Sequence, residues 1–323
     1  MRILVVGHER SATTWTGRVL GATARSGYLN EPDDPRMHPF AIRAMAGRGA
    51  FPVIGADDPG SEPLIDLWDV AYGIRQPRYV RGQHRASVRL LDRAPLQDKD
   101  RMESLARRLT PRLRLAAALG VPRHLSPDVE REHVVVKSVR VPFMLDWIRA
   151  RWNPTVVVCF RHPLDVVASV LAVGNVGHSA EAIEQRLPPA ARDYGTDHYG
   201  VPFPDDADRV RCLAWRVGLV MSRLDDARRA NPEFHVVEHS RICEDPPARL
   251  RELVDAIGLT WTADTETFVL DSDQPGTVWQ TKRVAGDQRD RWRTRLTPDD
   301  ARAAAAVLRQ FPIADRYASA LDI

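Results

Sequence analysis

The chain has 323 residues, of which 44% are apolar and 28% charged, with a formal net charge of +3. These values are typical of a globular protein, and the length suits one large α/β domain. The near-neutral charge balance argues against a nucleic-acid binder. The three scattered cysteines (Cys159, Cys212 and Cys243) exclude a disulfide framework and a CxxC zinc site.

The first predicted strand spans residues 3–6, a continuous apolar run typical of a strand covered on both faces. It is too short for a signal peptide, and no apolar run is long enough to span a membrane, so we expect a cytoplasmic protein. A turn over 7–12 and a helix over about 13–24 follow. Residues from about 60 to 130 are expected to form a helical insertion or lid, because the predicted helix at 85–119 is heavily charged.

Strands and helices alternate through the rest of the chain. Apolar runs predict strands at 133–137, 155–160 and 234–238, and the segments between and after them predict helices at about 142–150, 163–172, 211–229 and 247–257. This alternation predicts right-handed βαβ units and a doubly wound, mostly parallel sheet in a single domain over 1–323. Ligands of such sheets bind beyond the carboxyl ends of the strands, so the segments after the strands are the candidate site.

The turn after the first strand has the pattern of an anion site. Its residues are Gly7-His8-Glu9-Arg10-Ser11-Ala12-Thr13-Thr14, and it opens a helix whose first N–H groups and dipole attract anions. The spacing resembles the Walker loop GxxxxGK[ST], but Ala12 replaces the second glycine and Thr13 the lysine, so ATP hydrolysis is poorly supported. Arg10 supplies the positive charge, with Ser11, Thr13 and Thr14 as hydroxyl donors. The alternative is a plain helix N-cap at Ser11 or Thr13.

Residues 10–15, Arg-Ser-Ala-Thr-Thr-Trp, resemble the 5′-phosphosulfate loop of sulfotransferases, usually [KR]-S-G-T-T-[WL]. These enzymes use 3′-phosphoadenosine 5′-phosphosulfate as sulfuryl donor. The resemblance implies that Arg10 contacts the 5′-phosphosulfate, that Thr13 and Thr14 hold its oxygens, and that Trp15 stacks on adenine. Ala12 stands at the usual glycine, where its methyl group approaches the backbone that must pass close to phosphate.

A second motif follows the strand at 155–160. Arg161, Pro163, Asp165 and Ser169 match the family's 3′-phosphate signature R-x-P-x-D-x-x-x-S. The resemblance implies that Arg161 and Ser169 bind the 3′-phosphate and that Asp165 stabilises the start of the helix. The alternative is that Pro163 merely opens a helix.

The family often closes the 3′-phosphate site with a basic segment near the C-terminus. The candidates here are Lys282, Arg283, Gly286 and the basic run 291–293, with a solvated basic face as the alternative. His239, after the strand at 234–238, falls near the position of a tyrosine that lies beside adenine in the family.

Two residues resemble catalytic groups of the family. Glu31 lies 21 residues past Arg10 (31 − 10) and resembles the glutamate base of the carbohydrate and protein-tyrosine sulfotransferases. Lys137 resembles the lysine of the K-x-H motif of the cytosolic enzymes, but Val139 occupies the histidine position. The resemblance is therefore to a bacterial member closer to the glutamate branch, with Glu31, Arg10 and Lys137 as catalytic residues.

Other interpretations of these groups stay open. Glu31 could instead be a loop carboxylate paired with an arginine, and His8 and His38 are further candidates for the base. The expected reaction is in-line sulfuryl transfer from 3′-phosphoadenosine 5′-phosphosulfate to a hydroxyl of a small molecule or glycan, without a metal. Adenosine 3′,5′-bisphosphate is the expected product. The alternatives are a P-loop nucleotide kinase and a non-catalytic nucleotide-binding protein of the same fold. The sequence leaves the acceptor and the oligomeric state open.

Overall fold

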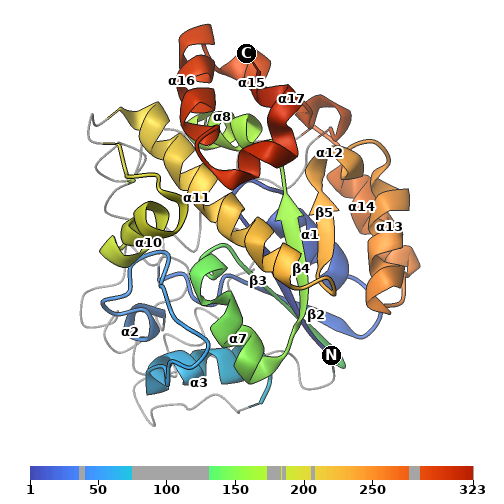
Figure 1. Ribbon diagram of the computed structural model, residues 1–323. Coiled ribbons are helices and arrows are strands. Elements are labelled where there is room, and N and C mark those ends of the chain that lie inside the picture. The colour runs from blue at the N-terminus through green and yellow to red at the C-terminus, as the bar shows by residue number, and fades with distance from the viewer. Residues whose placement is uncertain are drawn as a thin grey trace, which may run out of the picture.

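The computed structural model describes residues 1–35, 41–74, 131–172, 183, 187–204, 208–275 and 284–322. Five strands form one sheet in the order β2-β3-β1-β4-β5, and every pairing between them is parallel (Figure 1). The strands are β1 Arg2–Gly7, β2 Ser26–Asn30, β3 His133–Ser138, β4 Thr155–Phe160 and β5 His235–Glu238. The expected α/β fold with a parallel sheet is confirmed.

Side chains of each central strand alternate between two apolar clusters, as the period of two in a strand requires. Leu4 and Val6 of β1 pack into one cluster, whereas Ile3 and Val5 pack into the other. The first cluster is covered by α3 Glu62–Ala71, α7 Leu145–Trp152, α8 Pro163–Ala172, α11 Arg209–Ala230 and α16 Pro298–Leu308. The second is covered by α1 Thr13–Gly21, α13 Pro246–Ile257 and α14 Ala263–Ser272. Figure 1 shows α11 in front of the sheet and α1 behind it, so the sheet is covered on both faces.

The remaining elements are short or peripheral. They are the helices α2 Ala41–Ala44, α10 Pro189–Tyr199, α12 His239–Ile242, α15 Trp292–Arg295 and α17 Ala318–Leu321, and the 3₁₀ turns η2 Pro142–Met144, η3 Gly286–Gln288 and η4 Pro312–Tyr317. Within the described residues, no helix combines the length and the apolar character needed to cross a membrane.

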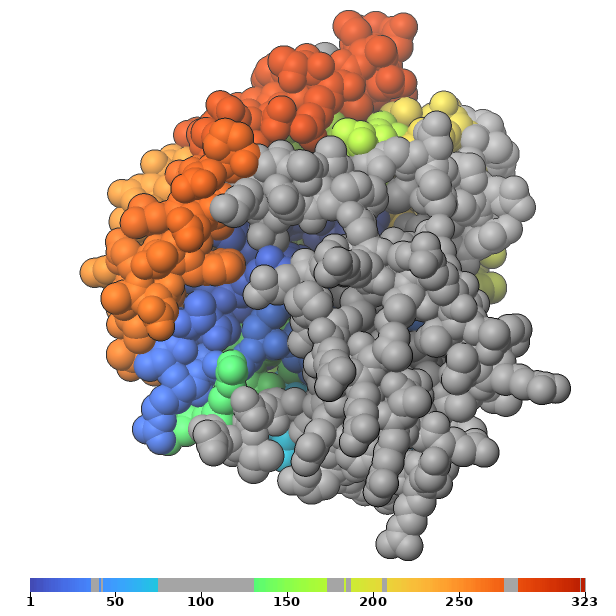
Figure 2. Space-filling model, turned by 180° about the vertical axis from the view of Figure 1, so that it is seen from behind, coloured from blue at the N-terminus to red at the C-terminus, as the bar shows by residue number. Residues whose placement is uncertain are grey.

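α1 lies beside α13 and α14 on the same face of the sheet. Seen from behind, the blue N-terminal segment lies beside the orange residues of α13 and α14 (Figure 2). The Thr265 hydroxyl of α14 donates to the carbonyl oxygen of Ala22, just past the end of α1, at 2.8 Å. At the other end of both helices, the Trp15 indole donates to the Ser272 hydroxyl at 2.7 Å. The two helices are therefore antiparallel, and the loop that precedes α1 lies at the carboxyl edge of the sheet.

The structure differs from the sequence expectation in four places. Strand β2 was not predicted, the first helix ends at Gly21 rather than near residue 24, and the helix expected at 142–150 is a 3₁₀ turn followed by α7. Residues 62–71, the start of the expected insertion, form α3, which is a core helix because Leu64, Leu67 and Trp68 are fully buried. Residues 75–130 lie outside the described part of the chain, so an insertion there stays a prediction.

Candidate functional site

The candidate residues lie at the carboxyl edge of the sheet, on four neighbouring strands. Glu31 follows β2, Lys137 is the penultimate residue of β3, the loop 8–12 follows β1, and Arg161 follows β4. Adjacent strands are about 4.8 Å apart, so the four strand ends lie within about 15 Å. α1 leaves β1 toward one face of the sheet and α8 leaves β4 toward the other, which places the topological switch point between these two loops.

The loop after β1 has the backbone conformation of an anion-binding nest. Arg10 and Ala12 both have positive φ angles, of 71° and 64°. Such left-handed residues, alternating with right-handed ones, turn successive N–H groups toward one point. Gly7 is required at the end of the strand, because a Cβ atom there would lie 2.7 Å from both the Cys159 carbonyl oxygen and Thr13 Cγ2. The loop is thus shaped by its backbone, as a phosphate site requires.

The first turn of α1 has no side-chain cap. Its N-cap residue is Ala12, in the left-handed conformation, and neither Ser11 nor Thr13 caps the helix. The alternative of a plain N-cap at either residue is therefore wrong. The Ser11 hydroxyl oxygen is buried and has no hydrogen-bond partner within the part of the chain that is described. The N–H groups of the first turn have no acceptor inside the helix either, so this helix start can serve a ligand.

The two arginine motifs meet. Arg10 Nε donates to the Ser169 hydroxyl of α8 at 2.9 Å, and Arg161 Nη1 donates to the Arg10 carbonyl oxygen at 3.2 Å. Arg161 and Ser169 are buried, with exposed fractions of 6% and 2%. Burial lowers the pKa of Arg161 from its usual value. One region therefore joins the residues that the sequence assigns to the two ends of one nucleotide.

The C-terminal segment covers this region through main-chain contacts. Arg161 Nη2 donates to the Gln288 carbonyl oxygen at 3.0 Å, and the Trp292 N–H donates to Asp165 Oδ1 at 2.9 Å. Asp165 was expected to stabilise the start of α8, and the structure adds a bond from it to the tail. The dipeptide at 282–283, expected to close the site, lies outside the described residues and stays a prediction.

Further arginines of the tail add positive charge near Arg161. Burial is the main reason that the pKa of Arg161 is lowered, and the neighbouring charges of Arg295 and Arg291 lower it further. Burial and Arg291 also lower the pKa of Arg295. The Asp165 carboxylate acts in the opposite direction on both arginines and offsets part of this positive charge, and a bound anion would offset more of it. The expected basic tail is thus near the second motif through residues 291–295.

Glu31 and Lys137 form a buried ion pair. Lys137 Nζ donates to Glu31 Oε1, and the Glu31 N–H donates to the Lys137 carbonyl oxygen at 2.7 Å. Their exposed fractions are 6% and 3%. Glu31 has a positive φ of 46°, so the chain turns sharply where it leaves β2. The sequence left open that an arginine pairs with Glu31. In the structure its partner is Lys137, which is itself a predicted site residue.

Two more buried carboxylates follow Glu31. The Ser138 hydroxyl contacts both oxygens of Asp33 at 2.8–2.9 Å, and Arg140 Nη2 lies 2.9 Å from Asp34 Oδ1. Burial raises the pKa of Asp33 to about 6, although Arg140 and the Ser138 hydroxyl act in the opposite direction. These pairs fix residues 31–34 against the end of β3.

His8, a reserve candidate for the base, is buried in the loop. Its Nδ1 donates to the Glu9 carbonyl oxygen at 2.8 Å, which leaves Nε2 as an acceptor. Burial, assisted by the charge of Arg216, lowers the pKa of His8 to about 4, so the imidazole is neutral near pH 7. A group with this pKa is a weak base near pH 7, so burial makes His8 a poorer candidate for the base than an ordinary histidine. His38 lies outside the described residues.

Trp15 and His239 flank the region in different ways. The Trp15 indole packs against the second apolar cluster, and its bond to Ser272 fixes its edge to α14. Stacking of Trp15 on adenine stays a prediction. His239 is buried, its pKa lies well below the usual value because of burial and of the nearby Arg161, and its ring contacts the Cys243 thiol. His239 is thus a buried histidine near Arg161, and a place for it beside adenine stays a prediction.

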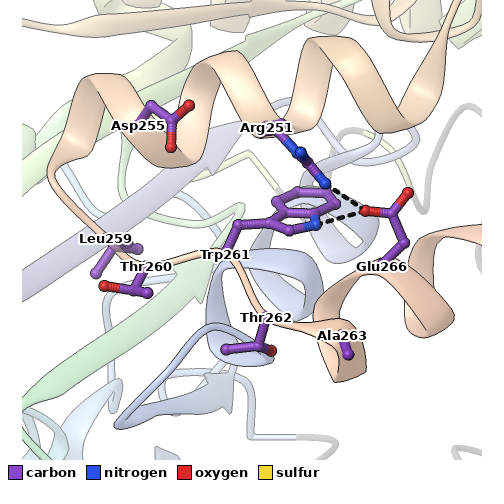
Figure 3. A pocket seen from close by; sticks show the side chains of 8 residues that line it. All are labelled: Arg251, Asp255, Leu259, Thr260, Trp261, Thr262, Ala263 and Glu266. Atoms are coloured by element: carbon purple, nitrogen blue, oxygen red, sulfur yellow. Dashed lines mark hydrogen bonds and ion pairs between the residues drawn. The ribbon is translucent and has the colours of Figure 1, made fainter.

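A shallow pocket of about 630 Å³ lies away from these residues, beside α13 and α14 (Figure 3). Glu266 Oε2 accepts from Arg251 at 2.6 Å and from the Trp261 indole at 2.7 Å. The pocket lies near the C-terminal end of α1, because the Ala24 N–H donates to the Thr260 carbonyl oxygen at 3.0 Å. Its ion pair is satisfied internally, and it is not part of the candidate site.

Sequence reasoning missed contacts of two kinds. Gln288 and Trp292 act through main-chain atoms, which leave no sequence signal. Arg216 is fully buried in α11 and pairs with Glu9 of the loop. Its signal is visible in hindsight, because residues 212–221 are apolar or small except for this one arginine.

The sequence matches no protein-family model and no curated protein. Among the described residues, no group of three or more His, Cys, Asp or Glu side chains is arranged to hold a metal ion. Solved structures that are similar in fold include three sulfotransferases. The sulfotransferase domain from the curacin biosynthetic pathway is 11% identical, with a TM-score of 0.48 over 94% of this chain and 96% of that chain.

Two further similar structures are mycobacterial. The sulfotransferase STF9 from Mycobacterium avium is 13% identical, with a TM-score of 0.43 over 100% of this chain and 77% of that chain. The sulfotransferase STF1 from Mycobacterium tuberculosis is 14% identical, with a TM-score of 0.38 over 90% and 76% of the two chains. At these identities and TM-scores, the function of this chain has to be inferred from its own residues.

Proposed function

We propose that this chain transfers a sulfuryl group from 3′-phosphoadenosine 5′-phosphosulfate to an acceptor hydroxyl and releases adenosine 3′,5′-bisphosphate. The observation that carries the proposal is the contact between the two arginine motifs. Arg10 reaches Ser169 at 2.9 Å and Arg161 reaches the Arg10 carbonyl oxygen at 3.2 Å, although the two motifs are some 150 residues apart in the chain. One nucleotide with phosphates at both ends of its ribose can contact both motifs.

The residues present fit such a donor. The left-handed residues Arg10 and Ala12 and the uncapped first turn of α1 offer N–H groups to the 5′-phosphosulfate. The buried Ser11 hydroxyl has no other partner among the described residues, and Thr13 and Thr14 follow it on the helix. Arg161 and Ser169 would hold the 3′-phosphate, with the tail arginines near it. The donor supplies the sulfuryl group; the chain supplies orientation and charge.

Glu31 is proposed as the general base. In the reaction, the acceptor oxygen forms a bond to sulfur, the bond from sulfur to the phosphate oxygen breaks, and the acceptor proton goes to the Glu31 carboxylate. Lys137 is bonded to that carboxylate in the structure. Once Glu31 is protonated, Lys137 loses its counter-charge, and its ammonium group can stabilise the negative charge that develops on the leaving phosphate. Arg10 and the loop N–H groups assist at the same point.

Calorimetry with adenosine 3′,5′-bisphosphate, AMP and ATP–Mg²⁺ tests the donor. We expect the bisphosphate to bind most tightly, and Arg161→Ala to weaken its binding by about tenfold to a hundredfold, because a charge-assisted hydrogen bond is lost. AMP binding should change much less. Arg251→Ala, in the separate pocket of Figure 3, is the control and should leave both affinities unchanged. Equal losses for AMP and the bisphosphate would remove Arg161 from the 3′-phosphate, and preferred binding of ATP–Mg²⁺ would favour a kinase.

Turnover of a panel of phenolic and sugar acceptors tests the base. Glu31→Gln should reduce kcat by about a hundredfold or more and leave bisphosphate affinity nearly unchanged. The glutamine oxygen can still accept from Lys137, so the local fold is kept. Glu132→Gln is the control, since this glutamate is 47% exposed and lies before β3, at the opposite edge of the sheet. Unchanged turnover in Glu31→Gln would exclude Glu31 as the base.

A further inference from the structure

One charged pair in the site is not explained by nucleotide contacts. Glu9 lies inside the anion-binding loop, where a carboxylate would repel a phosphate. Its side chain pairs with Arg216 Nη2, and Arg216 belongs to the first half of α11, Arg209–Ala230. The arginine neutralises this carboxylate, so Glu9 links the loop to α11 without opposing the anion.

The location of Arg216 is unusual. It is 0% exposed, and its neighbours Leu213, Trp215, Val217 and Leu219 are also fully buried. A buried guanidinium is costly unless it is paired, and an apolar residue of similar size is often at least as stable in such a place. The stability of α11 therefore does not explain why this position is an arginine. A role in holding another segment of the chain does explain it.

The loop near Arg216 is strained, and it is also held from α8 and from the end of β4, through the contacts of Arg10 with Ser169 and Arg161. Within it, the Ser11 N–H donates to the His8 carbonyl oxygen at 3.2 Å, and two of its non-glycine residues, Arg10 and Ala12, have left-handed backbones. Left-handed conformations of such residues are strained and persist only when the surroundings hold them. The nearness of Arg216 is also felt at His8, whose pKa it helps to lower.

We propose that Arg216 is a positioning residue that holds the phosphate loop in its binding conformation through Glu9. The expected effect on donor affinity rests on the proposed function. The expected effect on the loop does not, because it concerns the protein without a ligand. Arg216 acts through Glu9 and the loop, and it is not assigned a contact with the nucleotide.

The test uses the full-length chain and two measurements. Arg216→Leu should speed hydrogen exchange of the peptide over residues 8–16 in the free protein, with the rest of the chain unchanged. It should also weaken binding of adenosine 3′,5′-bisphosphate by about tenfold or more, because a charge-assisted bond that holds the loop is lost. Arg216→Lys, which keeps a charge able to reach Glu9, should restore most of both properties.

The control is Arg223→Leu. Arg223 lies two turns further along α11, is 12% exposed, and pairs with Asp146 at 2.6 Å. This variant should leave loop exchange and affinity as in the wild type. Unchanged loop exchange in Arg216→Leu, or an equal effect of Arg223→Leu, overturns the inference.

Two other results are also decisive. If Arg216→Leu does not fold, Glu9→Gln replaces it, since Glu9 is 25% exposed and its removal still has to speed exchange in the loop. If the wild-type protein binds no adenosine 3′,5′-bisphosphate, the proposed function fails, and loop exchange alone supports or overturns the anchoring.

Discussion

Ala12 occupies the position of the usual glycine in the phosphate loop. Its backbone conformation allows a prediction of how Ala12→Gly changes the free energy of unfolding. Its φ of 64° lies in the left-handed region, which costs a residue with a Cβ atom about 1–2 kcal/mol. Ala12→Gly removes this strain, while the more flexible unfolded chain offsets about 0.4–1 kcal/mol of the gain. The variant should therefore be more stable than the wild type by roughly 0.5–1 kcal/mol.

Urea unfolding measures this difference, provided that the m-value is unchanged. Ala22→Gly is the matched control, because Ala22 is the residue at the other end of the same helix and has a φ of −90°. There glycine relieves no strain and should cost about 0.5 kcal/mol. If both variants lose stability to the same extent, the left-handed conformation of Ala12 carries no strain and the reasoning is refuted. Binding of adenosine 3′,5′-bisphosphate by Ala12→Gly should be at least as tight as by the wild type.

Two further predictions concern buried groups near the site. Burial raises the pKa of Asp33 to about 6, so the folded protein holds a proton that the unfolded chain releases near pH 4. The free energy of unfolding should therefore fall by up to about 3 kcal/mol as pH rises from about 4 to about 6. Urea unfolding of Asp33→Asn at several pH values should lack this fall. The same pH dependence in Asp33→Asn and the wild type would show that Asp33 is not its source. A methyl group at Gly17 would lie 2.6 Å from Tyr28 Cε2, so Gly17→Ala should cost about 1 kcal/mol in urea unfolding even after its gain in helix propensity. In a Tyr28→Ala background the same change should become stabilising, and a cost that persists there would show that Tyr28 is not the obstacle.

The sequence predicted the strands that are buried on both faces and missed an edge strand. β1, β3 and β4 are continuous apolar runs because helices cover both of their faces. β2, Ser26–Asn30, lies at the edge and contains Gly27, where the Arg131 side chain packs so closely that a Cβ atom would lie 2.7 Å from it. Its apolar residues are too few to give a strand pattern, so its existence depends on pairing with β3.

The positions of the two motifs in the fold could be predicted from the sequence, whereas the roles of their residues stay predictions. The loop at 7–14 and the motif beginning at Arg161 both follow buried strands, and their sequence spacing was enough to place them at one edge of a parallel sheet. The link between Glu31 and Lys137 needs β2 to lie beside β3, and β2 was not predicted. Arg216 approaches the loop from a helix some 200 residues away in the chain, a proximity that packing alone decides.

The geometry around Ser169 indicates which donors a bound anion would use. The Ser169 hydroxyl oxygen accepts from Arg10, so its proton can be donated to a ligand. Within the described residues, Arg161 Nε has no hydrogen-bond partner. Asp165 Oδ2 is 3.9 Å from that nitrogen, which is beyond hydrogen-bond distance. A buried donor without an acceptor costs about 1–3 kcal/mol, and an anion that accepts from both groups would recover this cost on binding. A phosphate can accept from more donors than a neutral hydroxyl can, which is why loss of the Arg161 guanidinium should weaken binding of a nucleotide with a 3′-phosphate and hardly change binding of AMP.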